Sequence, residues 1–271
     1  MNSSTLKILA IGDIVGLQTL EYLKKELWKI RSSLGADAVI ANGENVCEIR
    51  GIGAQEAKEL LDAGVDLITT GNHVWGRRDI YQLLDEDSRI LRPANYPPTA
   101  PGLGSSVINV CGYRVLCINV QGTVYLDPLD NPFLTLEKIL KNEEGRYDLA
   151  LLDFHAEATS EKIAMGLCFD GRISAVWGTH THVQTADEKV LPKGTGYITD
   201  LGMTGPSDGI LGAAAEPIIE RFKTHMPQRF AVAEGDIVLC GALFEIEPGT
   251  GKCVSVKRVR IPAQKGASVN E

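Results

Sequence analysis

Several features that mark membrane, secreted and disulfide-rich proteins are missing from this sequence of 271 residues. Its apolar runs have the length of strands and are too short for a membrane-spanning helix, which needs roughly 20 apolar residues. The N-terminus has no basic segment followed by an apolar stretch and a cleavage site, so we expect no secretory signal. The six cysteines form no Cys-x-x-Cys pair. Together these absences favour a cytoplasmic protein with reduced thiols.

An excess of positive charge is also missing: 35 acidic residues outnumber 27 lysines and arginines, and the formal net charge is −8. This balance argues against a protein that coats nucleic acid by neutralising phosphates. It leaves room for a small phosphate substrate held by metal ions, because a bound cation can override the global field. With 44% hydrophobic and 23% charged residues, the composition is that of a globular protein. We expect a single domain over residues 1–271 with a loose tail at 262–271, either as a monomer or as a homo-oligomer.

Strand-like apolar runs alternate with helix-like segments in the first half of the chain. The runs cover residues 6–11, 38–41, 65–69, 148–154 and 173–177. Residues 19–30 show the helical spacing of an amphipathic helix. Further along, Cys111-Gly112 predicts a hairpin, and residues 236–246 and 253–261 predict a terminal antiparallel pair. This order predicts an α/β fold in which two mixed sheets form a sandwich.

Each of the five runs is followed by side chains that can bind a metal ion: Asp13, Glu44 and Asn45, Asn72 and His73, His155, and His180 and His182. Taken singly, each of these residues is explained as well by a turn, a helix cap or an ordinary histidine. Their recurrence is informative, because four of the five histidines of the chain fall in this set. Sites in open α/β sheets form beyond the carboxyl ends of the strands. We therefore expect these side chains to share one crevice.

The segment Gly178-Thr179-His180-Thr181-His182 gives this pattern its densest group of ligands. An apolar run stops at Gly178, and two histidines follow at positions i and i+2. In an extended segment these two side chains point to the same face. We therefore expect two imidazoles presented side by side to one ion or to a pair of ions.

Apart from His73, the candidate set contains two carboxylates, two carboxamides and three histidines. Because no cysteine takes part, a tetrahedral structural zinc site is not expected. Seven nitrogen and oxygen ligands are too many for one catalytic zinc and suit two ions such as iron, manganese or zinc. Two divalent ions with two carboxylates leave a formal charge of about +2, which attracts a phosphate ester. Paired ions can also generate a hydroxide nucleophile and stabilise its in-line attack on phosphorus.

The sequences of these motifs resemble those of the calcineurin-like metallophosphoesterases, and most closely those of the bacterial YmdB-type branch. The matching segments are GDIVG at 12–16, ANGEN at 41–45, GNH at 71–73, DFHAEATSEK at 153–162, GTHTH at 178–182 and TDLGMTGP at 199–206. The chain departs from the wider superfamily at Val15, where that superfamily has a histidine, and at Glu44, which replaces a bridging aspartate. Both departures match the YmdB-type branch, in which Asn45 can supply the lost ligand.

The resemblance implies a central β-sandwich flanked by helices and a centre of two divalent or mixed-valence ions, with iron favoured over manganese or zinc. It implies one ion held by Asp13, Glu44, Asn45 and His182, and a second held by the bridging Glu44 with Asn72, His155 and His180. It also implies that His73 is catalytic and assists the leaving group. The implied activity is hydrolysis of small phosphodiesters, notably 2′,3′-cyclic nucleotides.

Two other readings stay open at this point. One is a metal-stabilised regulatory or RNA-associated protein with incidental phosphodiesterase activity. The other is a metallohydrolase that acts on a substrate other than a phosphate ester. Asp200 and the glycines that follow it either shape a substrate loop or form a turn that supports the centre.

Overall fold

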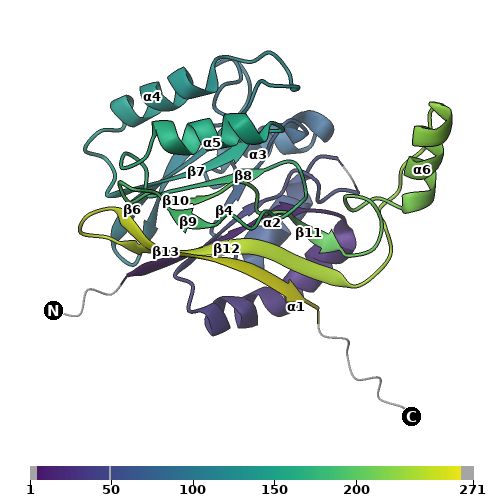
Figure 1. The fold of residues 1–271 in the computed structure, drawn as a ribbon, viewed down its shortest axis with the longest axis horizontal. Coiled ribbons are helices and arrows are strands. Elements are labelled where there is room, and N and C mark those ends of the chain that lie inside the picture. Colours follow the sequence, from purple (N-terminus) through teal and green to yellow (C-terminus); the bar gives the residue numbers. More distant parts are fainter. Residues whose placement is uncertain (1–4, 49, 264–271) are drawn as a thin grey trace, which may run out of the picture.

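The computed structural model describes residues 5–48 and 50–263. Within these ranges the strands form two mixed sheets (Figure 1). The first sheet has the order β2-β11-β12-β1-β3-β4, with β13 paired to β12. Its strands are β1 (Leu6–Ile11), β2 (Asp13–Ile14), β3 (Ala38–Asn42), β4 (Leu67–Thr69), β11 (Met203–Pro206), β12 (Ile237–Glu247) and β13 (Lys252–Pro262). Strands β1, β3 and β4 run parallel, whereas β12 runs antiparallel to β1, β11 and β13.

The second sheet has the order β5-β6-β7-β8-β10-β9. Its strands are β5 (Ser105–Val110), β6 (Tyr113–Gln121), β7 (Leu149–His155), β8 (Ala175–Thr179), β9 (Lys189–Val190) and β10 (Gly196–Ile198). Strands β6, β7, β8 and β10 are parallel, and β5 and β9 add antiparallel edges. The hairpin predicted at Cys111-Gly112 is confirmed, and Cys111 adopts a positive φ of 52° in the turn.

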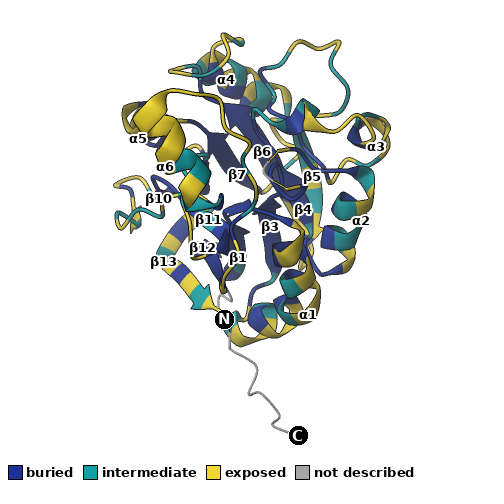
Figure 2. Cartoon of the chain, turned by 90° about the vertical axis from the view of Figure 1, so that its right-hand side faces the viewer, coloured by how far each residue is buried: buried dark blue, intermediate teal, exposed yellow. Residues whose placement is uncertain are grey.

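Helices cover the outer faces of both sheets, so that the molecule has four layers (Figures 1 and 2). The helices are α1 (Leu17–Leu34), α2 (Ala54–Asp62), α3 (Ile80–Glu86), α4 (Pro132–Asn142), α5 (Thr159–Cys168) and α6 (Ala215–Thr224), with a 3₁₀ turn η1 at Val74–Gly76. Helices α1, α2 and α3 pack on the first sheet, and α4 and α5 pack on the second. The predicted α/β sandwich with two mixed, helix-flanked sheets is confirmed.

Local sequence explains where the helices begin and end. The buried face of α1 carries Leu20, Leu23 and Leu27, spaced three or four residues apart. The helix ends at Gly35, whose φ of 62° gives the left-handed cap that glycine adopts without strain. At α4, the side chain of Asn131 accepts hydrogen bonds from the first free backbone N–H groups of the helix, and Pro132 occupies the first turn.

The two sheets bury their inner faces against each other. This central core contains Ile8 and Phe244 from the first sheet and Leu151 and Trp177 from the second. The rings of Trp177 and Phe244 lie 5.6 Å apart between centroids. Because helices cover the other face of each sheet, every residue of β3 and β7 is buried, which accounts for their nearly unbroken apolar sequences.

Two further observations concern the C-terminal end and the helices. Part of the predicted tail at 262–271 is ordered, because Pro262 pairs with Val238 and the N–H of Ala263 donates to the carbonyl of Ile237 at 2.7 Å. Residues 264–271 lie outside the described residues. Among the helices that the structure describes, none is long and apolar enough to cross a membrane.

Candidate metal centre

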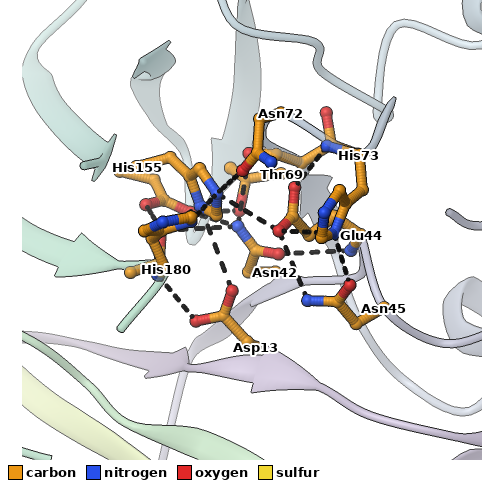
Figure 3. Close-up of polar contacts among 12 residues, drawn as sticks. Asp13, Asn42, Glu44, Asn45, Thr69, Asn72, His73, His155 and His180 are labelled. Atoms are coloured by element: carbon orange, nitrogen blue, oxygen red, sulfur yellow. Dashed lines mark hydrogen bonds and ion pairs between the residues drawn. The ribbon is translucent and has the colours of Figure 1, made fainter. Parts of the chain in front are cut away.

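The candidate ligands gather where the parallel strands of both sheets end (Figure 3). The register aligns these ends, because Asn42 at the end of β3 pairs with Thr69 on β4, and His155 at the end of β7 pairs with Thr179 on β8. The structure brings all eight predicted residues into one connected group of polar contacts: Asp13, Glu44, Asn45, Asn72, His73, His155, His180 and His182.

His155 is the focus of the first half of this group. It is buried, and its Nε2 atom lies 2.9 Å from Asn72 Oδ1, 3.2 Å from Glu44 Oε1 and 3.1 Å from His180 Nδ1. One proton on Nε2 can bond to only one of these three atoms. Four electron-rich atoms therefore meet at one point, as they do in the coordination shell of a cation.

Asp13, Asn45 and His182 form the second half. His182 Nε2 lies 3.8 Å from Asp13 Oδ1 and 3.3 Å from Asn45 Nδ2. The same Asn45 nitrogen lies 3.3 Å from Glu44 Oε1, so Glu44 touches both halves. Asp13 is fully buried, and among the described residues its Oδ1 atom has no hydrogen-bond partner. A buried carboxylate oxygen without a donor is costly unless a cation neutralises it.

The backbone at the two histidines of the GTHTH segment differs from the prediction. Strand β8 ends at Thr179, and His180 and His182 have positive φ angles of 97° and 65°. The expectation of an extended segment is therefore wrong, although both imidazoles contact residues of the centre. The N–H of His180 donates to Asp13 Oδ2 at 3.1 Å, which ties the loop to the first sheet. Left-handed backbone at a non-glycine residue costs on the order of 1 kcal/mol or more and clusters at functional sites.

Hydrogen bonds on the outer side of each imidazole assign the ring protons. His155 Nδ1 lies 2.9 Å from the hydroxyl of Thr179, which itself donates to Asp153 at 2.7 Å and so accepts from the ring. His180 Nε2 lies 3.1 Å from a Glu157 carboxylate oxygen, and His182 Nδ1 lies 3.0 Å from the carbonyl oxygen of Leu211. Because each outer nitrogen donates, the inner nitrogen of each neutral ring turns its lone pair to the centre.

The ionisation of the group follows from its burial and its internal pairing. Burial alone would raise the pKa of Glu44, but His155 and His73 outweigh it and lower the pKa to about 2. Burial disfavours a charged His155, but the carboxylates of Glu44 and Asp13 raise its pKa to about 9. Burial and the neighbouring His155 lower the pKa of His180 to about 3. The two carboxylates therefore favour a proton on His155, at a place where a cation also fits.

Gly71 leaves the space in which these ligands meet. A Cβ atom at this position would lie 2.2 Å from His155 Nε2 and 2.4 Å from Glu44 Oε2, closer than any real contact. Only glycine lets the end of β4 approach the two side chains this closely. The space beside Gly71, the inner imidazole nitrogens and the Asp13 oxygen that lacks a hydrogen-bond donor together fit a site that binds metal ions. Among the described residues, Glu44, His155 and His180 have ligand atoms within 4.8 Å of one another.

Comparison with known proteins agrees with this geometry. The sequence model of the family described as YmdB-like protein matches residues 9–259. The chain is 45% identical over 256 residues to the 2′,3′-cyclic-nucleotide 2′-phosphodiesterase of Bacillus subtilis, an alignment that covers 94% of this chain and 97% of the relative. This chain belongs to the YmdB-like protein family.

Two solved structures share the YmdB-like fold over nearly their whole lengths. A hypothetical protein from Thermus thermophilus is 41% identical, with a TM-score of 0.89 over 95% of this chain and 99% of that one. A protein described as a novel phosphatase from Mycoplasma pneumoniae is 33% identical, with a TM-score of 0.90 over 96% and 94%. The fold is the calcineurin-like phosphoesterase sandwich that the motifs indicated.

Behind the candidate ligands of this YmdB-like chain lies a buried layer that the sequence analysis did not single out. Asp153, in the middle of β7, accepts hydrogen bonds from Thr69 Oγ1 at 2.5 Å, Asn42 Nδ2 at 3.2 Å and Thr179 Oγ1 at 2.7 Å. Burial raises the pKa of Asp153 to about 6 against the effect of these donors. The sequence signal that could have identified Asp153 is a carboxylate inside a strand whose residues are otherwise mostly apolar.

Asp200 contacts the loop that carries His180 and His182. Its carboxylate accepts from the hydroxyl of Thr181 at 2.8 Å and forms a buried ion pair with Lys162 at 2.6 Å. Its second oxygen accepts from the N–H of Gly202 at 2.8 Å. Of the two roles considered for Asp200, the structure therefore gives it contacts that orient the loop between His180 and His182.

Proposed function

We propose that this chain is a dinuclear, metal-dependent phosphodiesterase that hydrolyses small phosphodiesters, in particular 2′,3′-cyclic nucleotides. The observation that carries the proposal is a group of three inner imidazole nitrogens and two buried carboxylates in two adjoining halves that Glu44 joins, with every outer imidazole nitrogen facing an acceptor outside the centre. The activity named for the Bacillus subtilis relative supports the choice of substrate, since it aligns over nearly the whole chain.

The side chains divide naturally between two ions. One ion would be held by Asp13, Glu44, Asn45 and His182, and the other by Glu44, Asn72, His155 and His180. When bound, the two ions would lower the pKa of a water molecule enough for it to act as the nucleophile, and they would face the phosphate oxygens with positive charge. Iron, manganese and zinc all suit this mixture of nitrogen and oxygen ligands.

His73 is the candidate residue that assists the leaving group. It is partly exposed at the mouth of the centre, and burial lowers its pKa, so the imidazole is neutral near pH 7. Its Nδ1 atom lies 2.8 Å from Asn45 Oδ1, while the Asn45 nitrogen faces Glu44 and His182. A half-turn of the Asn45 amide would direct its oxygen to the centre and its N–H to His73 Nδ1. Neutral His73 would then carry its N–H on Nε2, where it can donate a hydrogen bond to the leaving oxygen and stabilise the charge that develops there.

Activity and metal measurements on matched variants test this proposal. The purified wild-type protein is expected to contain about two metal equivalents per chain and to hydrolyse 2′,3′-cyclic nucleotides. The His73→Ala variant is expected to keep the metal and to lose about 100-fold or more in kcat. The control is His225→Asn, because His225 is exposed and asparagine tolerates its φ of 58°. A His73→Ala variant with wild-type turnover would refute the role of His73.

A wild-type protein that binds two metal equivalents but hydrolyses none of the cyclic nucleotides or simple phosphodiesters would refute the proposed activity. The regulatory or RNA-associated reading would then be favoured.

A further inference from the structure

A cavity of about 420 Å³ opens directly beside the candidate metal centre. His73, Asn45 and His182 form one side of it, and Val15 adds an apolar wall. The remaining walls come from the segment 210–213, helix α6 and Phe230. Because three residues of the centre also line the cavity, a substrate whose phosphate sits at the centre extends into this space. A volume of this size suits a small organic ligand.

Helix α6 provides the most unusual wall. It stands apart from the four layers of the molecule (Figure 1). None of its ten residues, all of which the structure describes, is buried. Ile218 and Phe222 lie one turn apart and line the cavity, and Phe222 is 75% exposed. The helix therefore has an apolar face with an open aromatic ring turned towards the centre.

The chemistry of the other walls matches a flat aromatic ligand. Ile210 and Leu211 contribute aliphatic surface, and the guanidinium of Arg221 lies over the ring of Phe230 at 5.5 Å from its centroid. Aromatic rings and arginine planes are the surfaces on which proteins stack nucleobases. A carboxylate is not among the residues that line this cavity in the described part of the chain.

We propose that this cavity holds the nucleobase of the substrate, with Phe222 and the Arg221–Phe230 pair as its stacking surfaces. The inference rests on the proposed phosphodiesterase function and adds the group that the enzyme recognises beyond the phosphate. The base of a 2′,3′-cyclic nucleotide is attached to the ribose carbon next to the cyclic phosphate. It therefore reaches the cavity while the phosphate stays at the centre.

One hydrogen bond links this cavity to the candidate ligands. Leu211 lines the cavity, and its carbonyl oxygen accepts from His182 Nδ1 at 3.0 Å. Leu211 has a positive φ of 52°, so the segment approaches the centre in a constrained conformation. The base and the phosphate are thus bound by parts of the chain that are fixed to each other.

The test compares a substrate that has a base with one that lacks it. Hydrolysis of 2′,3′-cyclic AMP and of methyl β-ribofuranoside 2′,3′-cyclic phosphate is measured for the wild type, Phe222→Ala and Phe230→Ala. Loss of one stacking ring is expected to lower kcat/KM for cyclic AMP by about 5- to 150-fold. The value for the base-free substrate is expected to stay within about 2-fold. Phe222→Tyr, which keeps the ring, is expected to restore most of the loss.

The control is Tyr125→Ala, which removes an aromatic side chain that is 89% exposed and lies outside the cavity lining. Equal loss on both substrates, or no loss on either, in both phenylalanine variants would overturn the nucleobase assignment. Conversion of an oligomer to a monomer by Phe222→Ala with unchanged kcat/KM would also overturn it, and would assign the α6 face to contacts between copies of the chain.

Failure of the proposed function gives a different result. In that case the wild type hydrolyses neither substrate. Binding of adenosine 3′-monophosphate and of ribose 5-phosphate to the metal-loaded protein then decides the question. Tighter binding of the adenine compound that is lost in Phe222→Ala supports the base site, and equal binding of the two overturns it.

Discussion

Replacement of Lys162 by methionine tests how the histidine loop is held in place. Lys162 and Asp200 are 2% and 1% exposed, and their charged atoms lie 2.6 Å apart. Methionine keeps the aliphatic stem of lysine, which packs against Gly178, and removes only the ammonium. The Asp200 carboxylate is then buried without its counter-charge. Breaking a buried pair in this way costs about 3–5 kcal/mol.

Unfolding of the protein after dialysis against a chelator measures this loss without a contribution from bound metal. For a chain of this size, a loss of 3–5 kcal/mol corresponds to a fall in Tm of about 6–20 °C. The double variant Lys162→Met with Asp200→Asn is expected to be more stable than the sum of the single effects predicts, because neither charge is left alone. Lys162→Met with a Tm within about 2 °C of the wild type would refute the reasoning.

The pair also has an exposed counterpart that serves as a control. Lys24 contacts Glu21 and Glu59 at 2.7 and 2.9 Å on the surface of α1. Water and salt screen these charges, so Lys24→Met is expected to leave Tm almost unchanged. A comparable fall in both variants would mean that Lys162 acts through general charge and not through burial of the pair.

Three further predictions concern the ligands themselves. Gly71→Ala is expected to abolish metal binding, since its Cβ would meet His155 Nε2 at 2.2 Å, whereas Gly249→Ala, with open space around it, is neutral in the same metal titration. Thr179→Val removes the acceptor for His155 Nδ1 and is expected to weaken metal affinity by about 10- to 100-fold, with recovery in Thr179→Ser. Calorimetry in buffers of different ionisation enthalpy is expected to show about one proton released on metal binding at pH 7, because Glu44 and Asp13 outweigh burial and raise the pKa of His155 to about 9. Apparent affinity then rises by about tenfold per pH unit between pH 6 and 8 and levels off above about pH 9, and a pH-independent affinity would contradict the assignment.

The parts of the fold that depend on local pattern could be predicted from the sequence. The apolar runs became β1, β3, β4, β7 and β8, because a strand buried on both faces needs a continuous apolar sequence. The polar residues that follow each run meet because parallel strands bring their carboxyl ends to one edge. Helix α1 extends over residues 17–34, beyond the predicted 19–30, because Gly16 and Gly35 and not the apolar face determine its ends.

The arrangement around the ligands depends on contacts that no local pattern contains. The left-handed backbone at His180 and His182 is held by Asp13 and by Asp200, which lie 167 residues before His180 and 19 residues after Thr181, respectively. In the sequence Lys162 has the pattern of an ordinary helix residue. Only the packing in the folded structure shows that its ammonium is buried. For the same reason an extended His-x-His segment was the natural expectation, and it was wrong.

These features together explain why the centre can be preorganised. Three outer acceptors hold the imidazole protons away from the centre, and the buried Lys162–Asp200 pair holds the loop that carries two of the rings. The positive φ angles at His180 and His182 cost stability, which the buried hydrogen bonds of this loop offset. Ligands that are already oriented lose little conformational freedom when ions bind. Variants that relax the loop are therefore expected to lose metal affinity even where every ligand is retained, so Lys162→Met should weaken metal binding as well as stability.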